Sequence, residues 1–319
     1  MAIKHSLMIG MMGRISDRFH NYQDAKDLGQ RLEMAKQIPT ADGIEVTYPS
    51  EFANMPEAIR LIKDSGLKLS AVNLNVKSEK HWQNGSFTSP DETIRDLAVK
   101  EMKTAMDLAV ELGTDMISCC PLIDGHNYAF EVDYLKQWAW LEGGIAEASQ
   151  HRGDVRISLE YKLNESRNFN LLSDMGRALY LCERIQQPHV GVTMDVGHAL
   201  IAKETPAEAL SLAALANRLF YVHFNDNARE WDWDMMPGSV NIWDLVEVMF
   251  YLRRLKWDGW FSYDVIVRDG DRVEGMQTSI EIVKTAEKLV DKIGMDAMEN
   301  MLKEGIPARA FRHLYQSLL

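Results

Sequence analysis

Short apolar runs alternate with longer amphipathic stretches along the whole chain. The short runs are rich in β-branched residues or change polarity at every second position, which is typical of strands. They predict strands at residues 6–12, 43–47, 67–76, 114–120, 155–161, 190–196, 219–224 and 260–265. Apolar residues recurring with a period of about 3.6 predict a helix after each strand. These helices are expected at residues 25–37, 55–65, 93–112, 132–150, 172–184, 206–216, 242–255 and 276–293.

Strict alternation of strand and helix favours parallel strands joined by right-handed crossovers. Eight strand–helix units close a barrel, so the sequence predicts an α/β fold of the (β/α)8 TIM-barrel class. An open doubly wound sheet is the structural alternative. The turn after the first strand lacks the pattern G-x-G-x-x-G, so nothing there supports a dinucleotide site.

The chain has 319 residues, a length that α/β barrels often fill as one domain. Residues 1–294 are expected to form the catalytic barrel domain. Residues 295–319 predict a C-terminal extension of one or two helices, broken at 305–307. This extension has apolar side chains that need a surface to cover, either the flank of the barrel or a neighbouring subunit. They are Met298, Met301, Leu302, Phe311, Leu314, Leu318 and Leu319.

Composition and charge narrow the class of partner. The formal net charge is −12, so the chain has no broad basic surface for nucleic acid or an anionic membrane. No signal-peptide pattern or apolar stretch of transmembrane length occurs. The three cysteines, Cys119, Cys120 and Cys182, show neither metal spacing nor a disulfide framework. We therefore expect a soluble cytoplasmic protein and, on base rates, a homo-oligomer.

Residues suited to metal binding stand at the ends of the last four predicted strands, which is where α/β barrels place their functional groups. Each strand offers one of them: Glu160, Asp195, His223 and Asp264. Three converging carboxylates would repel one another and raise their pKa values, a cost that a bound divalent cation removes. Ligands rich in oxygen with one imidazole suit Mn²⁺, Mg²⁺ or Co²⁺ better than structural zinc. Mn²⁺ is the expected ion, with one or two ions per chain.

A second set of ligand-type residues lies close by in the sequence. His198 follows the sixth strand, and Asp232 and Asp234 follow the seventh. They predict a site for a second ion, with Glu160 as a bridging ligand. Lys162 would offer an ammonium group to a substrate oxygen.

Blander roles compete with these assignments. A single carboxylate at a strand end more often caps the next helix, and Asp226 is the best candidate for such a loop role. Substrate-binding residues are expected mostly in the loops after strands one to four. The candidates there and after strand eight are Arg14, Asn73, Asn75, Trp82, His126 and Arg268. His126, Asn75 and Lys162 are the preferred substrate-binding residues. Trp82 could stack on a sugar ring, and its alternative role is packing in the core.

These motifs resemble the xylose-isomerase-like barrel superfamily of sugar isomerases and epimerases. The matching segments are LEYK (159–162), TMDVGH (193–198), HFND (223–226), WDWD (231–234) and YDV (263–265). Their order is similar to the L-rhamnose isomerase branch. That resemblance implies one metal site of Glu160, Asp195, His223 and Asp264. It implies a second site of His198, Asp232 and Asp234.

The resemblance also implies an aldose–ketose isomerase that works on a small free sugar by a metal-assisted hydride shift. Glu160, Lys162, Asp232 and Asp264 are its expected catalytic residues. The alternative is a ketose 3-epimerase or inosose-type lyase, in which Glu160 abstracts a proton. The epimerase branch generally has a glutamate where this chain has Asp264, and the D-x-D pair also favours the isomerase.

Two further alternatives belong to other functional classes. A DNA-repair nuclease of the endonuclease IV family shares the barrel, but it would need more histidine ligands and a basic groove. A carbohydrate-binding relative without catalysis would keep the fold alone. The full set of ligand positions argues against that relative.

Overall fold

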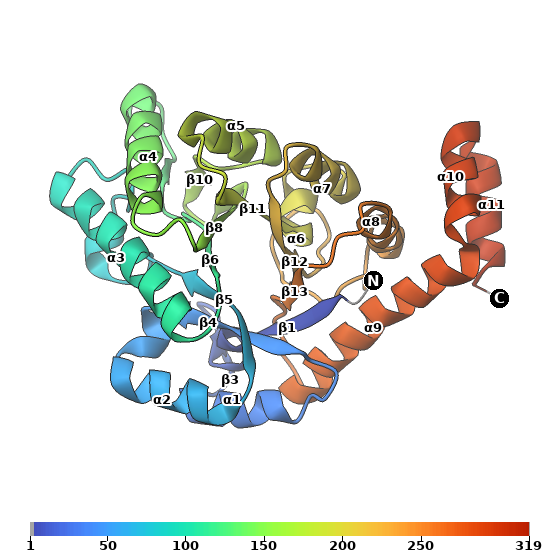
Figure 1. Ribbon diagram of the computed structural model, residues 1–319, viewed down its shortest axis with the longest axis horizontal. Coiled ribbons are helices and arrows are strands. Elements are labelled where there is room, and N and C mark those ends of the chain that lie inside the picture. The colour runs from blue at the N-terminus through green and yellow to red at the C-terminus, as the bar shows by residue number, and fades with distance from the viewer. Residues whose placement is uncertain (1–2, 319) are drawn as a thin grey trace.

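The computed structural model describes residues 3–318 and shows a closed barrel of parallel strands ringed by helices (Figure 1). Going round the barrel, the strands are β1 (Lys4–Met8), β13 (Trp260–Tyr263), β12 (Leu219–Phe224), β11 (Val190–Asp195), β8 (Arg156–Glu160), β6 (Met116–Cys119), β5 (Lys68–Leu74) and β4 (Gly43–Tyr48). Closure confirms the predicted (β/α)8 fold and excludes the open doubly wound sheet.

One helix after each barrel strand covers the outside of the barrel. These helices are α1 (Leu28–Lys36), α2 (Met55–Ser65), α3 (Glu92–Glu111), α4 (Tyr134–Ser149), α5 (Met175–Ile185), α7 (Pro206–Leu215), α8 (Ile242–Arg254) and α9 (Arg272–Ile293). An aspartate side chain accepts a backbone N–H at the start of α1, α3, α4, α5 and α9. Such caps satisfy amide groups that the first turn of a helix leaves without partners.

Two elements differ from the sequence prediction. The first strand ends at Met8, and the remainder of the predicted run forms the 3₁₀ turn η1 (Ile9–Met12). A buried apolar turn has the same composition as a strand end, so periodicity does not separate them. A short helix, α6 (Val196–Ile201), also follows β11 without any intervening loop.

The remaining short elements lie in the connecting segments. The strands β2 (Ile15–Ser16) and β3 (Asn21–Gln23) form one hairpin. A second small sheet contains β7 (Gly125–His126), β10 (Asn168–Asn170) and β9 (Asn164–Glu165). Two further 3₁₀ turns are η2 (Ser50–Phe52) and η3 (Lys80–Trp82).

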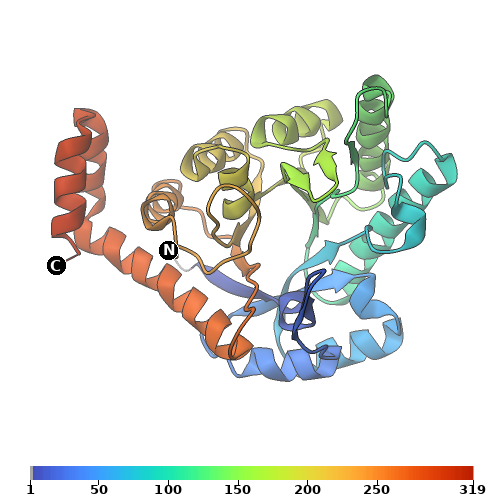
Figure 2. The ribbon, with the colours of Figure 1, turned by 180° about the vertical axis from the view of Figure 1, so that it is seen from behind.

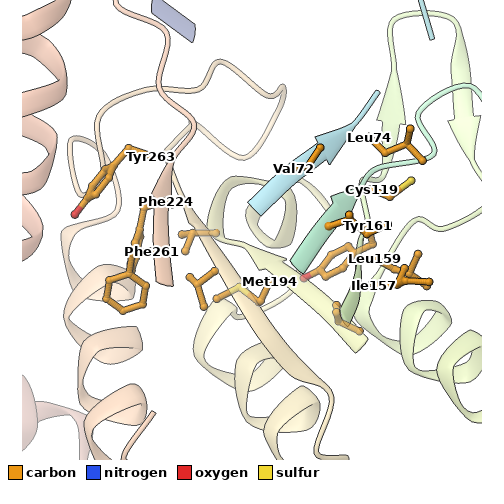
Figure 3. Packing of buried hydrophobic residues seen from close by; sticks show 14 of the residues in the cluster. Val72, Leu74, Cys119, Ile157, Leu159, Tyr161, Met194, Phe224, Phe261 and Tyr263 are labelled. Atoms are coloured by element: carbon orange, nitrogen blue, oxygen red, sulfur yellow. The ribbon is translucent and has the colours of Figure 1, made fainter. Parts of the chain in front are cut away.

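Alternation along the strands separates an apolar layer from a polar interior. Ile157, Leu159, Met194, Phe224 and Phe261 are fully buried members of the main apolar core (Figure 3). Burying each such side chain stabilises the fold by roughly 1.5–3 kcal/mol. This layer therefore carries most of the stability, and the interior positions are free to hold polar groups.

The C-terminal extension contains the helices α10 (Met295–Glu304) and α11 (Pro307–Gln316). They lie side by side at the far end of α9, at the edge of the molecule (Figures 1 and 2). The ring of Trp243 in α8 lies 6.0 Å from that of Phe311 and 5.2 Å from that of Tyr315. The predicted extra helices are thus present. The division of the chain into a barrel domain (1–294) and a C-terminal extension (295–319) stays a prediction. Over residues 3–318, no helix combines the length and apolar character needed to cross a bilayer.

Candidate metal centre

The four side chains predicted for the first metal site converge at the carboxyl ends of neighbouring strands. One ligand atom from each of Glu160, Asp195, His223 and Asp264 lies within 4.8 Å of all the others, and all four residues are buried. Glu160 ends β8, Asp195 ends β11 and His223 is the last residue but one of β12. Asp264 directly follows β13. The structure therefore brings together four residues that are far apart in the sequence.

Strand register explains this convergence. Asp195 is paired with His223, and Glu160 is paired with Thr193, two residues before Asp195. Side chains two residues apart on a strand point to the same face. Glu160, Asp195 and His223 therefore share the interior face at neighbouring heights.

Asp195 is fixed by hydrogen bonds to both of its carboxylate oxygens. Its Oδ1 accepts the backbone N–H of His198 at 2.8 Å and thereby caps the start of α6. Its Oδ2 accepts Nδ2 of Asn225 at 2.9 Å. The cap also places the His198 side chain beside the cluster, with Nδ1 3.2 Å from Oε1 of Glu160.

Burial and mutual repulsion disturb the charges of the cluster. Burial raises the pKa of Asp264 to about 7, and the charges of Asp195 and Glu160 add to this effect while His223 opposes it. Burial likewise raises the pKa of Asp195 to about 6. Burial also opposes the ionisation of Glu160, but the neighbouring His223 and His198 outweigh it and lower that pKa. The raised pKa values of Asp195 and Asp264 thus show that ionising all three carboxylates together is unfavourable in this buried space.

An orphaned oxygen shows that the cluster fits a cation. Oδ1 of Asp264 is buried and has no hydrogen-bond partner among residues 3–318. A buried acceptor without a partner costs about 1–3 kcal/mol, and more when it is charged. A divalent ion ligated by three carboxylates and one imidazole would satisfy that oxygen and neutralise the repulsion.

The second predicted ligand set is only partly assembled around one point. Nε2 of His198 lies 3.2 Å from Oδ2 of Asp232, and the same oxygen lies 2.8 Å from Nζ of Lys162. Lys162 also contacts Glu165 at 2.7 Å. Asp232 thus has two cationic partners, which lower its pKa although burial opposes them.

Asp234 belongs to the same acidic surroundings. Burial and the charges of Asp232 and Asp264 raise its pKa well above the usual range. Between the two aspartates, Trp233 is 48% exposed, whereas the side chain of Asp232 is 4% exposed. The ring of Trp233 therefore lies toward solvent, whereas the carboxylate of Asp232 points inward.

Asp226 has the loop role expected for it. Its Oδ2 accepts the backbone N–H groups of Val240 and Asn241, and its Oδ1 accepts Nδ2 of Asn241. These bonds close the long loop between β12 and α8. Asp226 therefore shapes the segment that carries Asp232 and Asp234.

The residues predicted to bind substrate lie on several loops. Asn75 follows β5 and His126 ends β7, and each has one buried side-chain atom, Oδ1 and Nδ1 respectively, without a hydrogen-bond partner among residues 3–318. Trp82 is 2% exposed and belongs to the apolar core, which is its structural alternative. Arg14 contacts Asn21, and Arg268 forms an exposed ion pair with its neighbour Asp269.

A cavity of about 820 Å³ opens beside α4, lined by its residues Lys136, Gln137 and Trp140 and by residues within 77–90, 122–133 and 165–168. Glu165 lines it, and Glu165 contacts Lys162. None of the four cluster residues lines this cavity. The cavity and the four-residue cluster are therefore distinct features of the barrel mouth.

One buried charged residue beside the cluster was not predicted from the sequence. Glu45 lies fully buried on β4, and its Oε2 is 3.1 Å from Nε2 of His223. The signal was available, since Glu45 is a charged residue between Ile44 and Val46 in a predicted strand. A carboxylate in that position must face the interior and find a partner there.

Comparison with known proteins places this architecture in a family. The family described as "Xylose isomerase-like TIM barrel" matches residues 32–286, most of the chain and all four cluster residues. The chain belongs to the xylose isomerase-like TIM barrel family. The superfamily to which its motifs were compared is thereby confirmed, whereas the L-rhamnose isomerase branch stays a prediction.

A curated relative is similar to this chain over part of its length. The xylose isomerase of Thermus thermophilus is 28% identical over 189 residues, which cover 57% of this chain and 49% of that protein. The matched stretch thus spans about half the length of that curated relative.

Two solved structures share the fold of this xylose isomerase-like chain. A D-tagatose 3-epimerase-like protein has a TM-score of 0.70 and 19% identity, with 91% of this chain and 99% of that chain covered. An L-ribulose 3-epimerase has a TM-score of 0.67 and 17% identity, with 95% and 97% covered. At these identities the likeness concerns the fold.

Proposed function

We propose that this protein is a divalent-metal-dependent aldose–ketose isomerase acting on a small free sugar. The observation that carries the proposal is the buried convergence of Glu160, Asp195, His223 and Asp264 within 4.8 Å. Membership of the xylose isomerase-like family supports a sugar as the substrate. Mn²⁺ is the proposed ion, and Mg²⁺ or Co²⁺ are alternatives with the same preference for oxygen ligands. When bound, such an ion polarises a substrate carbonyl and orients adjacent sugar oxygens.

Lys162 is proposed to bind the carbonyl oxygen of the sugar. Its side chain is 11% exposed, and the acidic neighbours Asp232 and Glu165 raise its pKa although burial opposes them. It therefore stays protonated and can donate to an oxygen on which negative charge develops. The two ion pairs hold the side chain at the mouth of the barrel before substrate arrives.

His198, Asp232 and Asp234 are proposed as the ligands of a second ion, with Glu160 between the two sites. Oδ1 of Asp232 is buried and without a hydrogen-bond partner in the part of the chain described, as Oδ1 of Asp264 is. Asp232 also contacts Lys162 and is proposed to exchange a proton with a hydroxyl of the sugar. His126 and Asn75 are proposed to bind other hydroxyls of the sugar through their unpartnered atoms.

A ketose 3-epimerase is the second candidate. The arrangement that favours it is the presence of Glu160 and Asp264 as two carboxylates on one buried cluster, since epimerisation uses an acid and a base. The fold shared with an L-ribulose 3-epimerase adds to this. In that reaction, Glu160 would remove a proton from carbon, and solvent hydrogen would enter the product.

Proton NMR in D₂O separates the two candidates. The protein is stripped with a chelator, reloaded with Mn²⁺ and incubated with free tetroses, pentoses and hexoses. We expect one aldose–ketose pair to interconvert without solvent deuterium at the reacting carbons. Deuterium at C3 of a ketose with inverted configuration would assign the epimerase. Turnover that persists in the stripped protein would contradict both candidates.

A further inference from the structure

The contacts of Glu45 cross the interior of the barrel. β4, which carries Glu45, is separated from β12 by β1 and β13 in the closed sheet. Oε2 of Glu45 nevertheless lies 3.1 Å from Nε2 of His223 and accepts the hydroxyl of Tyr221 at 2.9 Å. Its Oε1 accepts Nδ2 of Asn73 on β5 at 3.0 Å. Glu45 is not one of the four cluster residues. Three different side chains hold its carboxylate next to His223, which is one of them.

This contact determines which nitrogen of His223 can bind a metal. A neutral imidazole has one N–H group and one nitrogen lone pair, and only the lone pair ligates a metal. A carboxylate can only accept, so Glu45 favours the proton on Nε2. Nδ1 lies 3.2 Å from Oε1 of Glu160 and 3.8 Å from Oδ2 of Asp195, so it donates to the cluster in the metal-free protein and is the nitrogen that would lose its proton to bind an ion there.

We propose that Glu45 is a positioning residue, which holds His223 in the Nε2-protonated tautomer so that Nδ1 faces the metal site. The proposal rests on the metal centre of the proposed function. Burying a carboxylate is costly unless its oxygens are hydrogen-bonded, and Asn73, Tyr221 and His223 supply those bonds. Carboxylate partners of metal-bound histidines fix the orientation of the ring and increase its basicity.

Replacing Glu45 by glutamine tests the tautomer with little change of shape. The amide keeps one accepting oxygen and introduces an NH₂ donor, so Asn73, Tyr221 and His223 compete for a single acceptor. An NH₂ group facing Nε2 favours the tautomer with its proton on Nδ1, where the metal should bind. We expect Glu45→Gln to weaken binding of Mn²⁺ and Cd²⁺ by about 10- to 100-fold.

Glu51→Gln is the matched control. Glu51 is another glutamate whose side chain is nearly buried. Its Oε2 accepts the backbone N–H of Thr47 at 2.7 Å, and Thr47 lies in β4 two residues after Glu45. Its ion pair is with Arg31, and it has no hydrogen bond or ion pair with His223. This variant should lose thermal stability but keep metal affinity within about twofold, because Glu51 neither contacts His223 nor belongs to the four-residue cluster.

NMR of the ¹⁵N-histidine-labelled protein gives a readout independent of activity. We expect a protected proton on Nε2 of His223 in both metal-free and ¹¹³Cd-loaded wild type, and ¹¹³Cd–¹⁵N coupling at Nδ1 after loading. Glu45→Gln should lose the protected proton, whereas Glu51→Gln should keep it. Melting curves of all three proteins report folding separately.

Coupling at Nε2, an absent Nε2 proton in wild type, or unchanged metal affinity in a folded Glu45→Gln protein would each overturn the proposal. If Glu45→Gln does not fold, the wild-type spectra alone decide. If wild type binds no divalent ion, the metal centre of the proposed function is rejected. The Nε2 proton of the metal-free protein then still tests the positioning by Glu45.

Discussion

Two acidic groups at the barrel mouth differ in what balances their charge. Asp264 has a buried oxygen without a partner in the described residues, and burial together with neighbouring carboxylates raises its pKa to about 7. Asp232 lies 2.8 Å from Lys162 and 3.2 Å from His198, and its pKa is lowered although burial opposes this. Asp264 forms no ion pair within residues 3–318, whereas Asp232 already has two cationic partners, Lys162 and His198.

This difference ranks the two proposed metal sites. An ion at the cluster of Glu160, Asp195, His223 and Asp264 removes repulsion, so binding there gains free energy. An ion held by Asp232 instead competes with Lys162 for the same oxygen. We therefore expect the four-residue cluster to fill first and the second set to fill more weakly, with Lys162 released toward the substrate.

The largest effect is expected from removing a cluster ligand. Asp195→Ala or His223→Ala should abolish metal retention and lower turnover by at least about 10³-fold, since polarisation by a metal contributes several kcal/mol. The barrel should stay folded, as circular dichroism would show. Metal content after gel filtration is the measurement, and a variant that keeps both ion and activity would remove that residue from the site.

Changing the second set should have a smaller and more selective effect. Asp232→Asn combined with Asp234→Asn should leave one ion bound and reduce isomerisation by about 10²-fold, as expected when a general acid–base group is lost. Calorimetric titration with Mn²⁺ would count the ions in parallel with turnover. Unchanged turnover in this double variant would reject the two-metal scheme.

The pH dependence of metal binding follows from the raised pKa values. In the metal-free protein, Asp195 and Asp264 hold protons up to a pH of about 6 and about 7, respectively. Protons therefore compete with the ion, and affinity should rise by about tenfold per pH unit for each proton released as pH increases to 7. A flat affinity between pH 5 and about 7 would contradict this assignment.

The stability of the stripped protein should change in the opposite direction. The pKa of Asp264 is higher in the folded state, about 7, than its ordinary value of 3.8. Its contribution to stability is complete below that ordinary value and is lost as pH rises through about 7. Thermal melts of chelator-treated protein from pH 4 to about 8 would show this loss, and added Mn²⁺ should reverse it.

The smallest expected effect is on the thermal stability of the metal-free Asp264→Asn variant. Removing one repelling charge should stabilise the stripped variant by about 1 kcal/mol, or roughly 2–4 °C in Tm, while metal binding is lost. The same melts with Mn²⁺ should stabilise wild type only. A stripped variant less stable than stripped wild type would show that this carboxylate is balanced by the protein.

The sequence predicted the cluster because barrel geometry needs only the ends of strands. Glu160, Asp195 and His223 lie in strands whose alternation was visible, and Asp264 directly follows such a strand. Glu45 was not predicted because it lies within β4, whereas the predicted ligands stand at the ends of the last four strands. Its apolar neighbours in the sequence nevertheless indicate a charged group in the interior.

Other features of the site could not be predicted from the local pattern of apolar and polar residues. The helix α6 has six residues, too few for periodicity to show, yet it places His198 beside Glu160. The position of His126 depends on pairing of β7 with β10, whose residues are more than forty positions away. The balance of charge at Asp232 depends on Lys162 from another strand end. Such contacts are set by tertiary packing.

Anomalous diffraction from crystals of the stripped protein soaked in MnCl₂ would locate the bound ions. We expect a peak enclosed by Glu160, Asp195, His223 and Asp264 at the lowest concentration. A second peak beside His198, Asp232 and Asp234 should follow only at higher concentration. A peak confined to the second set, or no peak within the four-residue cluster, would contradict the account.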